Sequence, residues 1–343
     1  MTSLTCLSRM QPRVTLAATV GGEMPVSGTA YYFRRPSLRA RLLGATSLLC
    51  LALVLSDAAQ AEPYERPGFY DRSFVALEGG YLFNGSDKNV DFHQTGFLSG
   101  LPALAPGHDG GMFGISFGRP IDPYWDWAFA WKYNSFGTAN ASTSENFASN
   151  QFAFQHFDFE FGYRPQTAGP VDVRFFGGLR VLNAHDRIHY GFDTTKLGTL
   201  DKLGNFDHKI DLWGAGPRGG FQATLPLGNS PAFLNLSGAA SAIFTQETTR
   251  YDFSFSKATF GSPITGSGSS RTHNSPTVYN LEGSVAVGFR VSPTATFQIG
   301  YQAQQWWNLV TRIGDADDVG GFQPGRSNVL SHGPVAKITI ALP

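Results

Sequence analysis

Charged side chains, cysteines and long apolar runs are all scarce in this chain. Only 15% of its 343 residues are charged, whereas glycine occurs 40 times and phenylalanine 29 times. This composition lacks the Lys, Glu and Leu excess of helical proteins and favours an all-β fold. Residues 62–343 contain no run of 18 apolar residues, which excludes a transmembrane helix from that part of the chain.

The few cysteines and the charge balance narrow the function. Cys6 and Cys50 are the two cysteines, and both lie within residues 1–61, so the rest of the chain has neither disulfide nor thiol. A domain of the remaining length can be stable without disulfides. Residues 1–61 also hold six of the 26 basic and two of the 26 acidic residues, which leaves 20 against 24. This mildly acidic balance argues against nucleic acid as a partner.

Residues 1–61 have the pattern of a leader that ends in a secretory signal peptide. Four arginines between positions 34 and 41 precede an uncharged run over residues 42–56, and the small-residue sequence AQA follows at 59–61. The uncharged run is shorter than the roughly 20 apolar residues of a membrane-spanning helix, so cleavage is favoured over anchoring. We therefore expect export, cleavage before Glu62, and a single domain over residues 62–343.

Ten segments alternate between apolar and polar side chains, as strands with two different faces do. They are residues 73–83, 110–119, 125–134, 154–164, 172–182, 211–225, 232–244, 278–291, 296–309 and 334–342. Strands of about ten residues are long enough to cross a bilayer with a tilt. Two irregularities are expected: a bulge or bend at Pro217, which cannot donate to a ladder, and a change of parity at Gln155–His156, which indicates a bulge or the edge of the apolar band.

The connections between these segments alternate in length. Those after the second, fourth, sixth and eighth segments are short, whereas the others are long and polar, at 84–107, 137–150, 192–207, 252–275 and 310–328. Outer-membrane barrels have short periplasmic turns, long extracellular loops and an even number of strands. We therefore predict an antiparallel up-and-down transmembrane β-barrel of about ten strands in a bacterial outer membrane, with Trp125, Trp127 and Tyr163 in its periplasmic aromatic girdle. A secreted soluble β-sandwich or lipocalin-like barrel is the alternative.

In such a barrel the polar positions of each strand face inward. This places twelve charged side chains in the lumen as candidate pore-lining residues: Glu78, Asp126, Lys132, Asp158, Glu160, Arg164, Arg174, Arg180, Arg218, Glu282, Arg290 and Lys337. If Arg164 faces Pro170 across the short turn, Glu160 stands opposite Arg174 and Asp158 opposite Phe176. Such ion pairs either line a constriction that sorts ions by charge or form a plug. Ten strands lie near the closed end of barrel sizes, so only a narrow passage is expected.

Several motifs resemble the Legionella-type major outer membrane protein family. DFEFGYR, VRFFGGLR, GAGPRGGF, LEGSVAVGF, IGYQAQQWWN and SHGP occur in that family's order and approximate spacing over roughly residues 73–340. The resemblance implies a pore-forming barrel of the outer membrane with no established catalytic residues. The chain ends in KITIALP, without the terminal aromatic residue that such barrels commonly present to the barrel-assembly machinery. Recognition would then rest on Ile338, Ile340 and Leu342.

The function expected from these observations is weakly selective passage of small solutes or ions, with a structural or adhesive barrel without conductance as the alternative. An enzyme is a further possibility because His185, Asp186, His189, His208 and Asp211 lie near the outer rim. Polar rim groups are usually solvated, so we predict no enzyme, no metal and no cofactor. The expected partners are outer-membrane lipid, lipopolysaccharide, the barrel-assembly machinery and small solutes or ions, and an oligomer is left open.

Overall fold

The computed structural model describes residues 72–85, 109–142, 146–166, 170–193, 202–259, 262–316 and 322–343. The leader and the cleavage site lie outside these residues, and the single-domain assignment over 62–343 stays a prediction. The described strands are β1 (Phe74–Asn84), β2 (Gly110–Pro120), β3 (Trp125–Phe136), β4 (Ala139–Ser142), β5 (Asn146–Tyr163), β6 (Asp172–Asp193), β7 (Lys202–Pro226), β8 (Ala232–Thr259), β9 (Ser262–Asn274), β10 (Thr277–Ser292), β11 (Ala295–Ala316) and β12 (Phe322–Ala341). Among the described residues, no helix is long and apolar enough to span a membrane.

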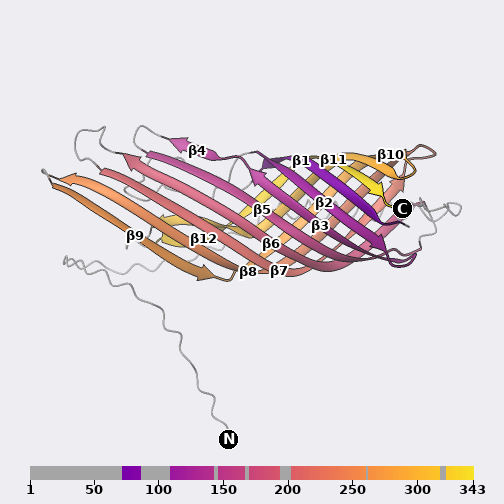
Figure 1. Ribbon diagram of the computed structural model, residues 1–343, viewed down its shortest axis with the longest axis horizontal. Coiled ribbons are helices and arrows are strands. Elements are labelled where there is room, and N and C mark those ends of the chain that lie inside the picture. Colours follow the sequence, from indigo (N-terminus) through magenta and orange to yellow (C-terminus); the bar gives the residue numbers. More distant parts are fainter. Residues whose placement is uncertain are drawn as a thin grey trace, which may run out of the picture. The chain divides into compact units, whose positions relative to one another are not determined.

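Ten of the described strands form a closed antiparallel ring, in the order β1-β2-β3-β5-β6-β7-β8-β10-β11-β12 (Figure 1). The ring closes where β1 pairs with β12, with Glu78 opposite Lys337. The two remaining strands lie outside the ring: β4 pairs with β5 beyond the end of β3, and β9 pairs with the far end of β8 beyond β10. The predicted ten-stranded antiparallel barrel is therefore confirmed.

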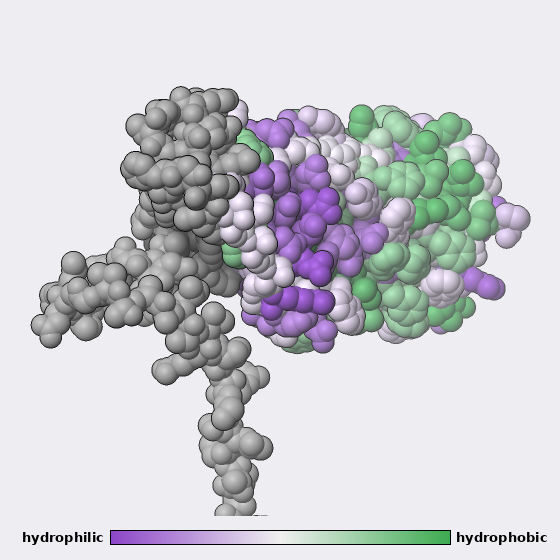
Figure 2. Space-filling view, turned by 60° about the vertical axis from the view of Figure 1, so that its left-hand side comes forward, coloured by the Kyte–Doolittle hydropathy of each residue, from purple (hydrophilic) through white to green (hydrophobic). Residues whose placement is uncertain are grey.

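Exposure of the apolar side chains decides between a membrane barrel and a soluble sandwich. The aromatic residues Phe157, Phe159, Phe161 and Tyr163 of β5 are between 38% and 48% exposed, whereas Asp158 between them is buried. A soluble sandwich would bury such a row of rings in its core. Hydrophobic side chains gather in the same way over one end of the surface, next to a hydrophilic zone (Figure 2). The aromatic face is thus the outside, and it faces lipid.

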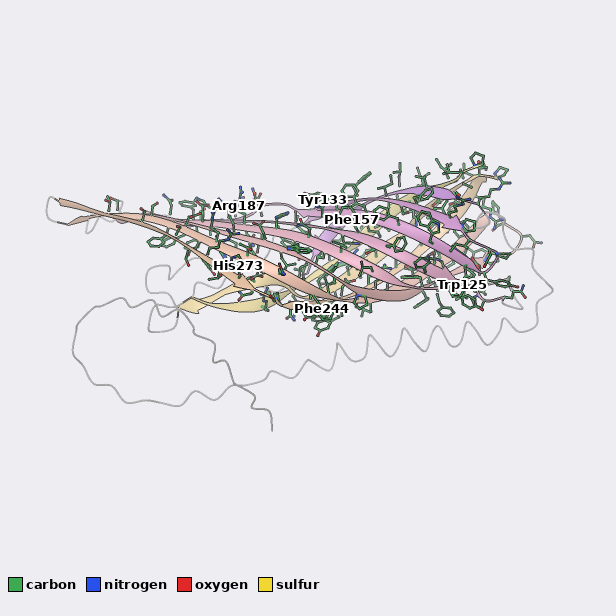
Figure 3. The ribbon with its side chains drawn as sticks, turned by 60° about the horizontal axis from the view of Figure 1, so that its bottom comes forward. Trp125, Tyr133, Phe157, Arg187, Phe244 and His273 are labelled. Atoms are coloured by element: carbon green, nitrogen blue, oxygen red, sulfur yellow. The ribbon has the colours of Figure 1, made fainter. Side chains whose placement is uncertain are left out.

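The short turns mark the periplasmic end of the barrel, and the long hairpins mark the extracellular end. Beside the short turn at residues 121–124, the ring of Trp125 lies 4.9 Å from that of Tyr163. Figure 3 shows Trp125 near this end, Phe157, Tyr133 and Phe244 further along the barrel, and Arg187 beyond them in the direction of the other end. Outward aromatic side chains therefore occur from the periplasmic end to the middle of the barrel, and Phe147 is a further exposed ring on the outward face beyond that level.

The connections predicted as long loops are in large part strands. Within 137–150 lie β4 and the start of β5, within 252–275 lie the end of β8 and all of β9, and within 310–328 lie the end of β11 and the start of β12. These segments lack apolar alternation because they stand beyond the lipid, yet their backbone ladders continue. Most of 84–107 lies outside the described residues. Where the structure describes it, the extracellular side of the barrel is consequently an extension of the sheet.

Neither of the two predicted positions contains a bulge. The register of β7 is the same on either side of Pro217, although the pairing with β8 is interrupted there. The register of β5 with β6 runs unbroken through Gln155 and His156. The change of parity instead reflects the level in the barrel, because Gln155 is a polar residue on the outward face while Phe154 points into an apolar part of the interior. Among the described strands, the register shifts instead in β11, between Trp306 and Val310 and between Ile313 and Ala316, and in β10 between Arg290 and Ser292.

Aromatic stacking holds the inner face of the extracellular extension. Tyr190 stacks on Phe206 at 4.7 Å between ring centroids, and His208 stacks on Tyr251 at 4.2 Å. On the outward face of β7, polar side chains replace apolar ones beyond Trp213, so His208 lies outside the membrane-spanning part. Burial lowers the pKa of the His208 imidazole to about 4, and the nearby Glu247 carboxylate only partly opposes this.

We expect the extension to loosen in acid because of His208. Its pKa is lower in the folded protein than in the unfolded chain, so the stabilisation is complete above about pH 6.5 and is lost as the pH falls towards 4. The difference of pKa corresponds to about 3 kcal/mol at most. Hydrogen exchange of the β7 and β8 amides at neutral and at acidic pH measures this loss of stability. The variant His208→Phe keeps the stacking and should remove the pH dependence; equal acid sensitivity in both proteins would contradict this assignment.

Candidate functional site

Two layers of side chains occupy the periplasmic and middle parts of the barrel interior. The ionic layer lies toward the periplasmic end and includes all twelve candidates from the sequence together with two further residues, Asp172 and Asn280. The apolar layer lies toward the extracellular end and consists of Leu82, Met112, Phe136, Phe152, Phe154, Leu182, Ala184, Leu212, Ile243, Val278, Trp306, Leu309, Val310, Val329 and Val335. In β5, which runs toward a short turn, Phe152 and Phe154 accordingly precede Asp158 and Glu160.

Asp126 binds two arginines in the part of the ionic layer nearest the turns. Nη2 of Arg174 donates to Oδ1 of Asp126 at 2.7 Å, and Nε of Arg164 donates to Oδ2 at 3.0 Å. Arg164 also donates to Asp172 at 2.7 Å. A Cβ at Gly162 would meet the ends of the Arg174 and Asp126 side chains, so a larger residue here would have to displace this ion pair. Asp172 was missed by the sequence analysis, although it shares the parity of Arg174 two residues later.

Arg180 connects strands that are not neighbours in the ring. Its Nε and Nη2 donate to the two oxygens of Asp158 on β5 at 2.6 Å and 2.7 Å, which is a bidentate pair. Its Nη1 donates to Oδ1 of Asn280 at 2.6 Å, and Nη2 lies 3.1 Å from Oε2 of Glu282, both on β10. The Arg180 side chain is fully buried. The ionic layer therefore spans the interior and does not merely coat the wall.

Arg218 completes the network from β7. Its guanidinium binds Glu160 and Glu282, and its Nε lies 3.4 Å from Oδ2 of Asp158. The inward ring of Phe176 lies against two guanidinium groups, 4.8 Å from Arg218 and 5.1 Å from Arg174. These contacts are cation–π interactions, which strengthen where water is excluded. The buried carboxylates of this network thus have compensating partners, as a confined interior requires.

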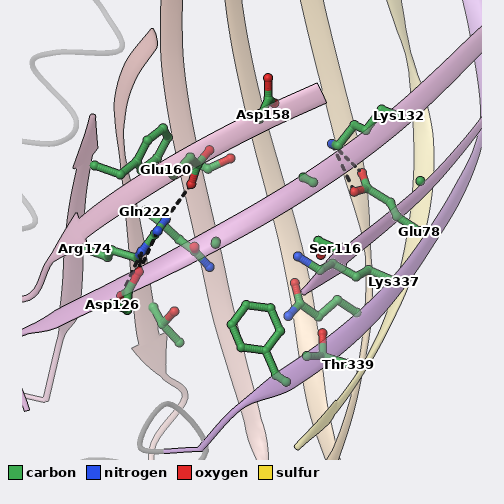
Figure 4. A pocket seen from close by; sticks show the side chains of 18 of the residues that line it. Glu78, Ser116, Asp126, Lys132, Asp158, Glu160, Arg174, Gln222, Lys337 and Thr339 are labelled. Carbon is green, nitrogen blue, oxygen red and sulfur yellow. Dashed lines mark hydrogen bonds and ion pairs between the residues drawn. The ribbon is translucent and has the colours of Figure 1, made fainter. Parts of the chain in front are cut away.

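Two basic side chains of the ionic layer differ from the rest. Nζ of Lys132 lies 3.0 Å from Oε2 of Glu78, whereas Lys337 and Arg290 form no ion pair with the described residues. Glu78, Lys132, Arg290 and Lys337 line a cavity of about 200 Å³. A second cavity of about 130 Å³ is also lined by Glu78, Lys132 and Lys337. Figure 4 shows Lys337 extending beside Ser116 and Thr339, away from the paired groups around Asp126. The cavity therefore has space for water and small ions beside free positive charge.

The register predicted across the short turn between β5 and β6 is wrong by four residues. Glu160 stands opposite Gly178, and Asp158 stands opposite Arg180. The turn is looser than the predicted Arg164–Pro170 pairing, because Tyr163 already faces Phe175. Arg174 nevertheless reaches Glu160, with Nη1 at 2.9 Å from Oε2, because both lie on the inward face within the reach of an arginine side chain.

The apolar layer lies above the ionic layer and reaches across the barrel. The ring of Trp306 on β11 meets that of Phe154 on β5 edge-on, with 5.2 Å between centroids. In the ring of ten strands, β5 and β11 are five strands apart in either direction, so the contact crosses the full width of the barrel. Phe152 and Phe136 stack behind Phe154 at 5.7 Å and 5.8 Å between successive ring centroids. The lumen is therefore polar toward the periplasmic end and apolar at the level of Trp306, and buried polar side chains such as Asp186, His208 and Thr249 line it again further toward the extracellular end.

The bulge in β11 adjoins Trp306, since the register with β12 shifts between Trp306 and Val310. Asn308 has a φ of 63°, in the left-handed region that asparagine adopts more readily than most residues. Its Nδ2 donates to the backbone oxygen of Thr277 at 3.1 Å, which fixes the bulge against β10. Trp306 is fully buried, whereas Trp307 beside it is 37% exposed on the outward face. The sequence contained a signal for Trp306, since it continues the inward parity of the preceding glutamines.

The histidines near the outer rim do not form one cluster. His185 lies 2.6 Å from Asp211 and His189 lies 3.0 Å from Asp207, and these pairs stand on the outward face. Asp186 and His208 are buried on the inward face. The part of the chain that the structure describes contains no group of three His, Cys, Asp or Glu side chains that could hold a metal ion. Catalysis and metal binding therefore gain no geometric support from these residues, and the prediction of no enzyme stays a prediction.

The comparisons with known proteins give one family and several similar structures. The family described as Legionella pneumophila major outer membrane protein precursor matches residues 70–341. The similar solved structures include the outer membrane protease OmpT from Escherichia coli (8% identity, TM-score 0.41, covering 80% of this chain and 97% of that chain). A major outer membrane protein from Thermus thermophilus (13%, 0.28, 77% and 99%) and the Pseudomonas putida toluene transporter TodX (9%, 0.34, 82% and 93%) are also similar. No curated protein matches the chain.

Removal of Arg180 should destabilise the barrel more than removal of an exposed charge. Arg180→Met leaves Asp158 without its bidentate partner in the interior, and we expect a loss of about 3–5 kcal/mol in the free energy of unfolding. Arg290→Met is the matched control, because Arg290 is exposed and unpaired in the described residues, and it should change stability by less than about 0.5 kcal/mol. Urea unfolding in detergent micelles measures both. Equal stabilities would show that the Arg180 network is dispensable.

Proposed function

The chain belongs to the Legionella pneumophila major outer membrane protein family, and from this premise we propose that it gives small ions and solutes a narrow, weakly selective passage across the bacterial outer membrane. The ionic layer is the polar segment of that passage. The apolar layer is its closure, and the resting state passes little. All twelve candidate residues take part as lining or as supports of the lining.

The charged cavity at the periplasmic end carries this proposal. Most of its charges are fixed in pairs by arginine side chains, so the polar walls keep their shape without ligand. Lys337 and Arg290 add positive charge that no described carboxylate neutralises through an ion pair. The remaining acidic and basic side chains of the ionic layer are nearly equal in number. A lining of this kind excludes neither sign of ion strongly, which favours weak selectivity with a slight preference for anions.

The apolar layer supplies a physical basis for closure. Hydrophobic constrictions gate channels because water leaves a narrow apolar segment, and ions cannot enter without water. Trp306 reaches the opposite wall, and its ring lies against the Arg180 guanidinium at 5.5 Å. A rotation of this side chain would connect the cavity to the extracellular side. The Asn308 bulge, where the ladder is already interrupted, adjoins it in the wall.

A structural barrel without conductance is the second candidate. The contact between Trp306 and Phe154 favours it, since buried rings packed from opposite walls form a core and not a channel. The two candidates differ in one measurable respect. A gated passage conducts more when the apolar layer is opened, whereas a solid core loses stability and conducts nothing.

The variant Trp306→Ala should increase single-channel conductance in planar bilayers several-fold over that of the wild-type protein. The large side chain that bridges the lumen is then gone, and water can enter the apolar layer. Trp307→Ala is the matched control, since Trp307 is the adjacent tryptophan on the lipid-facing surface. It should leave the conductance unchanged. If wild type and Trp306→Ala both show no stepwise conductance while remaining folded by heat-modifiable gel mobility, the structural barrel is the correct function.

Lys337 should influence which ions pass. Lys337→Gln removes an unpaired positive charge from the cavity without breaking an ion pair of the described residues, so the anion preference should fall. The expected change in permeability ratio is up to about fivefold, because a unit charge about 4 Å from an ion in water contributes about 1 kcal/mol. Reversal potentials in a salt gradient measure it, best in the Trp306→Ala background. Arg119→Gln, on the exposed outward face of β2, is the control. Identical reversal potentials for all three proteins would place Lys337 outside the passage.

A further inference from the structure

Four basic side chains form a row across the outward face of the extracellular extension. Arg187 on β6 stands opposite Lys209 on β7, Lys209 opposite Arg250 on β8, and Arg250 opposite Arg271 on β9. Directly opposite residues in an antiparallel sheet share a face, so all four side chains lie next to one another. At about 4.8 Å between strands, this basic row is roughly 14 Å long.

The basic row carries charge that the described side chains do not neutralise. None of the four residues forms an ion pair with a described carboxylate. The neighbouring Asp207 and Asp211 bind His189 and His185 instead, and Asp252 stands on the same flank as Asp207. Like charges directly opposite each other in a sheet are destabilising, and the row contains three such pairs in succession. A bound anion would offset this cost.

The basic row stands just beyond the lipid-facing surface of the same strands. Trp213 on β7 and Phe244 on β8 are 55% and 66% exposed, and after them the outward side chains of both strands are polar up to Lys209 and Arg250. Figure 3 shows Arg187 on the extracellular side of Tyr133 and Phe244. The row is therefore at the level where headgroups of the outer leaflet meet the barrel.

A groove lies beside one end of the basic row. Its volume is about 520 Å³, and Arg187 and Lys209 line it together with Tyr133, Thr138 and Gln151. It lies where β3 has ended and β4 begins. Nε2 of Gln151 donates to Oγ1 of Thr138 at 3.2 Å, which fixes the polar wall of the groove. The groove thus offers the positive charges of Arg187 and Lys209, one amide group and a tyrosine ring, while the carboxylates of Asp186 and Asp211 also line it.

We propose that the basic row and this groove bind the phosphorylated sugar headgroup of lipopolysaccharide. Several adjacent positive charges match a ligand that carries more than one phosphate, and arginine binds phosphate oxygens with two parallel N–H donors. The exposed Trp213 and Phe244 lie below the row, where the acyl chains of the same molecule run. Both halves of an amphiphile are therefore matched on one face. A free phosphate would use the row but not the apolar surface beneath it.

Binding of purified lipopolysaccharide to the refolded protein in detergent micelles tests this proposal. The medium contains a chelator, so that divalent cations do not bridge carboxylates to phosphates. The test variant is Lys209→Gln with Arg250→Gln, the two central residues of the row. The matched control is Arg72→Gln with Arg119→Gln, two exposed arginines near the periplasmic end. Heat-modifiable gel mobility verifies that each protein is folded, and conductance provides a readout that the proposed site should not affect.

We expect the test variant to bind at least about tenfold more weakly than the wild type, and the control variant to bind as the wild type does. Dephosphorylated lipopolysaccharide should bind the wild type as weakly as the intact lipid binds the test variant. Test and control variants with equal affinity would overturn the proposal, as would a test variant that still distinguishes the two lipids. Release of the lipid by excess inorganic phosphate alone would assign the row to free anions instead.

Discussion

Closure of the ten-strand ladder through the pairing of β1 with β12 forces every second side chain of each strand into a narrow interior. A ring of this size cannot hold a wide water column, so inward side chains meet across it. Charged groups placed there must find partners, because an unpaired charge in a confined space is costly. The bidentate pair of Arg180 with Asp158 and the contact of Trp306 with Phe154 are both consequences of that confinement.

The two layers of the interior divide the barrel into parts with different physical properties. The ionic layer keeps a cavity of about 200 Å³ because its long side chains are fixed by hydrogen bonds and leave space between them. The apolar layer packs like a protein core, since rings and branched side chains fill space without needing partners. Trp306 belongs to the apolar layer and touches Arg180 of the ionic layer. A change in either layer therefore affects the other, which makes this contact the natural position for a closure.

The outward side chains of the barrel alternate with the inward ones, but they face the lipid of the membrane and the medium outside it. Where the strands cross lipid, outward positions are aromatic or aliphatic, and where they extend beyond it, outward positions become charged. The basic row of Arg187, Lys209, Arg250 and Arg271 is assembled from four consecutive strands, β6 to β9, although its residues are not adjacent in the sequence. Each basic residue alone resembles an ordinary exposed charge. Only the register of the sheet makes them neighbours.

The sequence by itself determined the period of alternation, the positions of the short turns and hence the ten-stranded barrel, because these depend on neighbouring residues. It also placed Asp158, Glu160 and Arg174 on the inward face, since parity within a strand is a local property. Tertiary structure alone decided the register between β5 and β6, the partners of Arg180 and the crossing of the lumen by Trp306. Those features depend on which residues face each other across the barrel. Closure of the ring determines that arrangement, and no segment determines it alone.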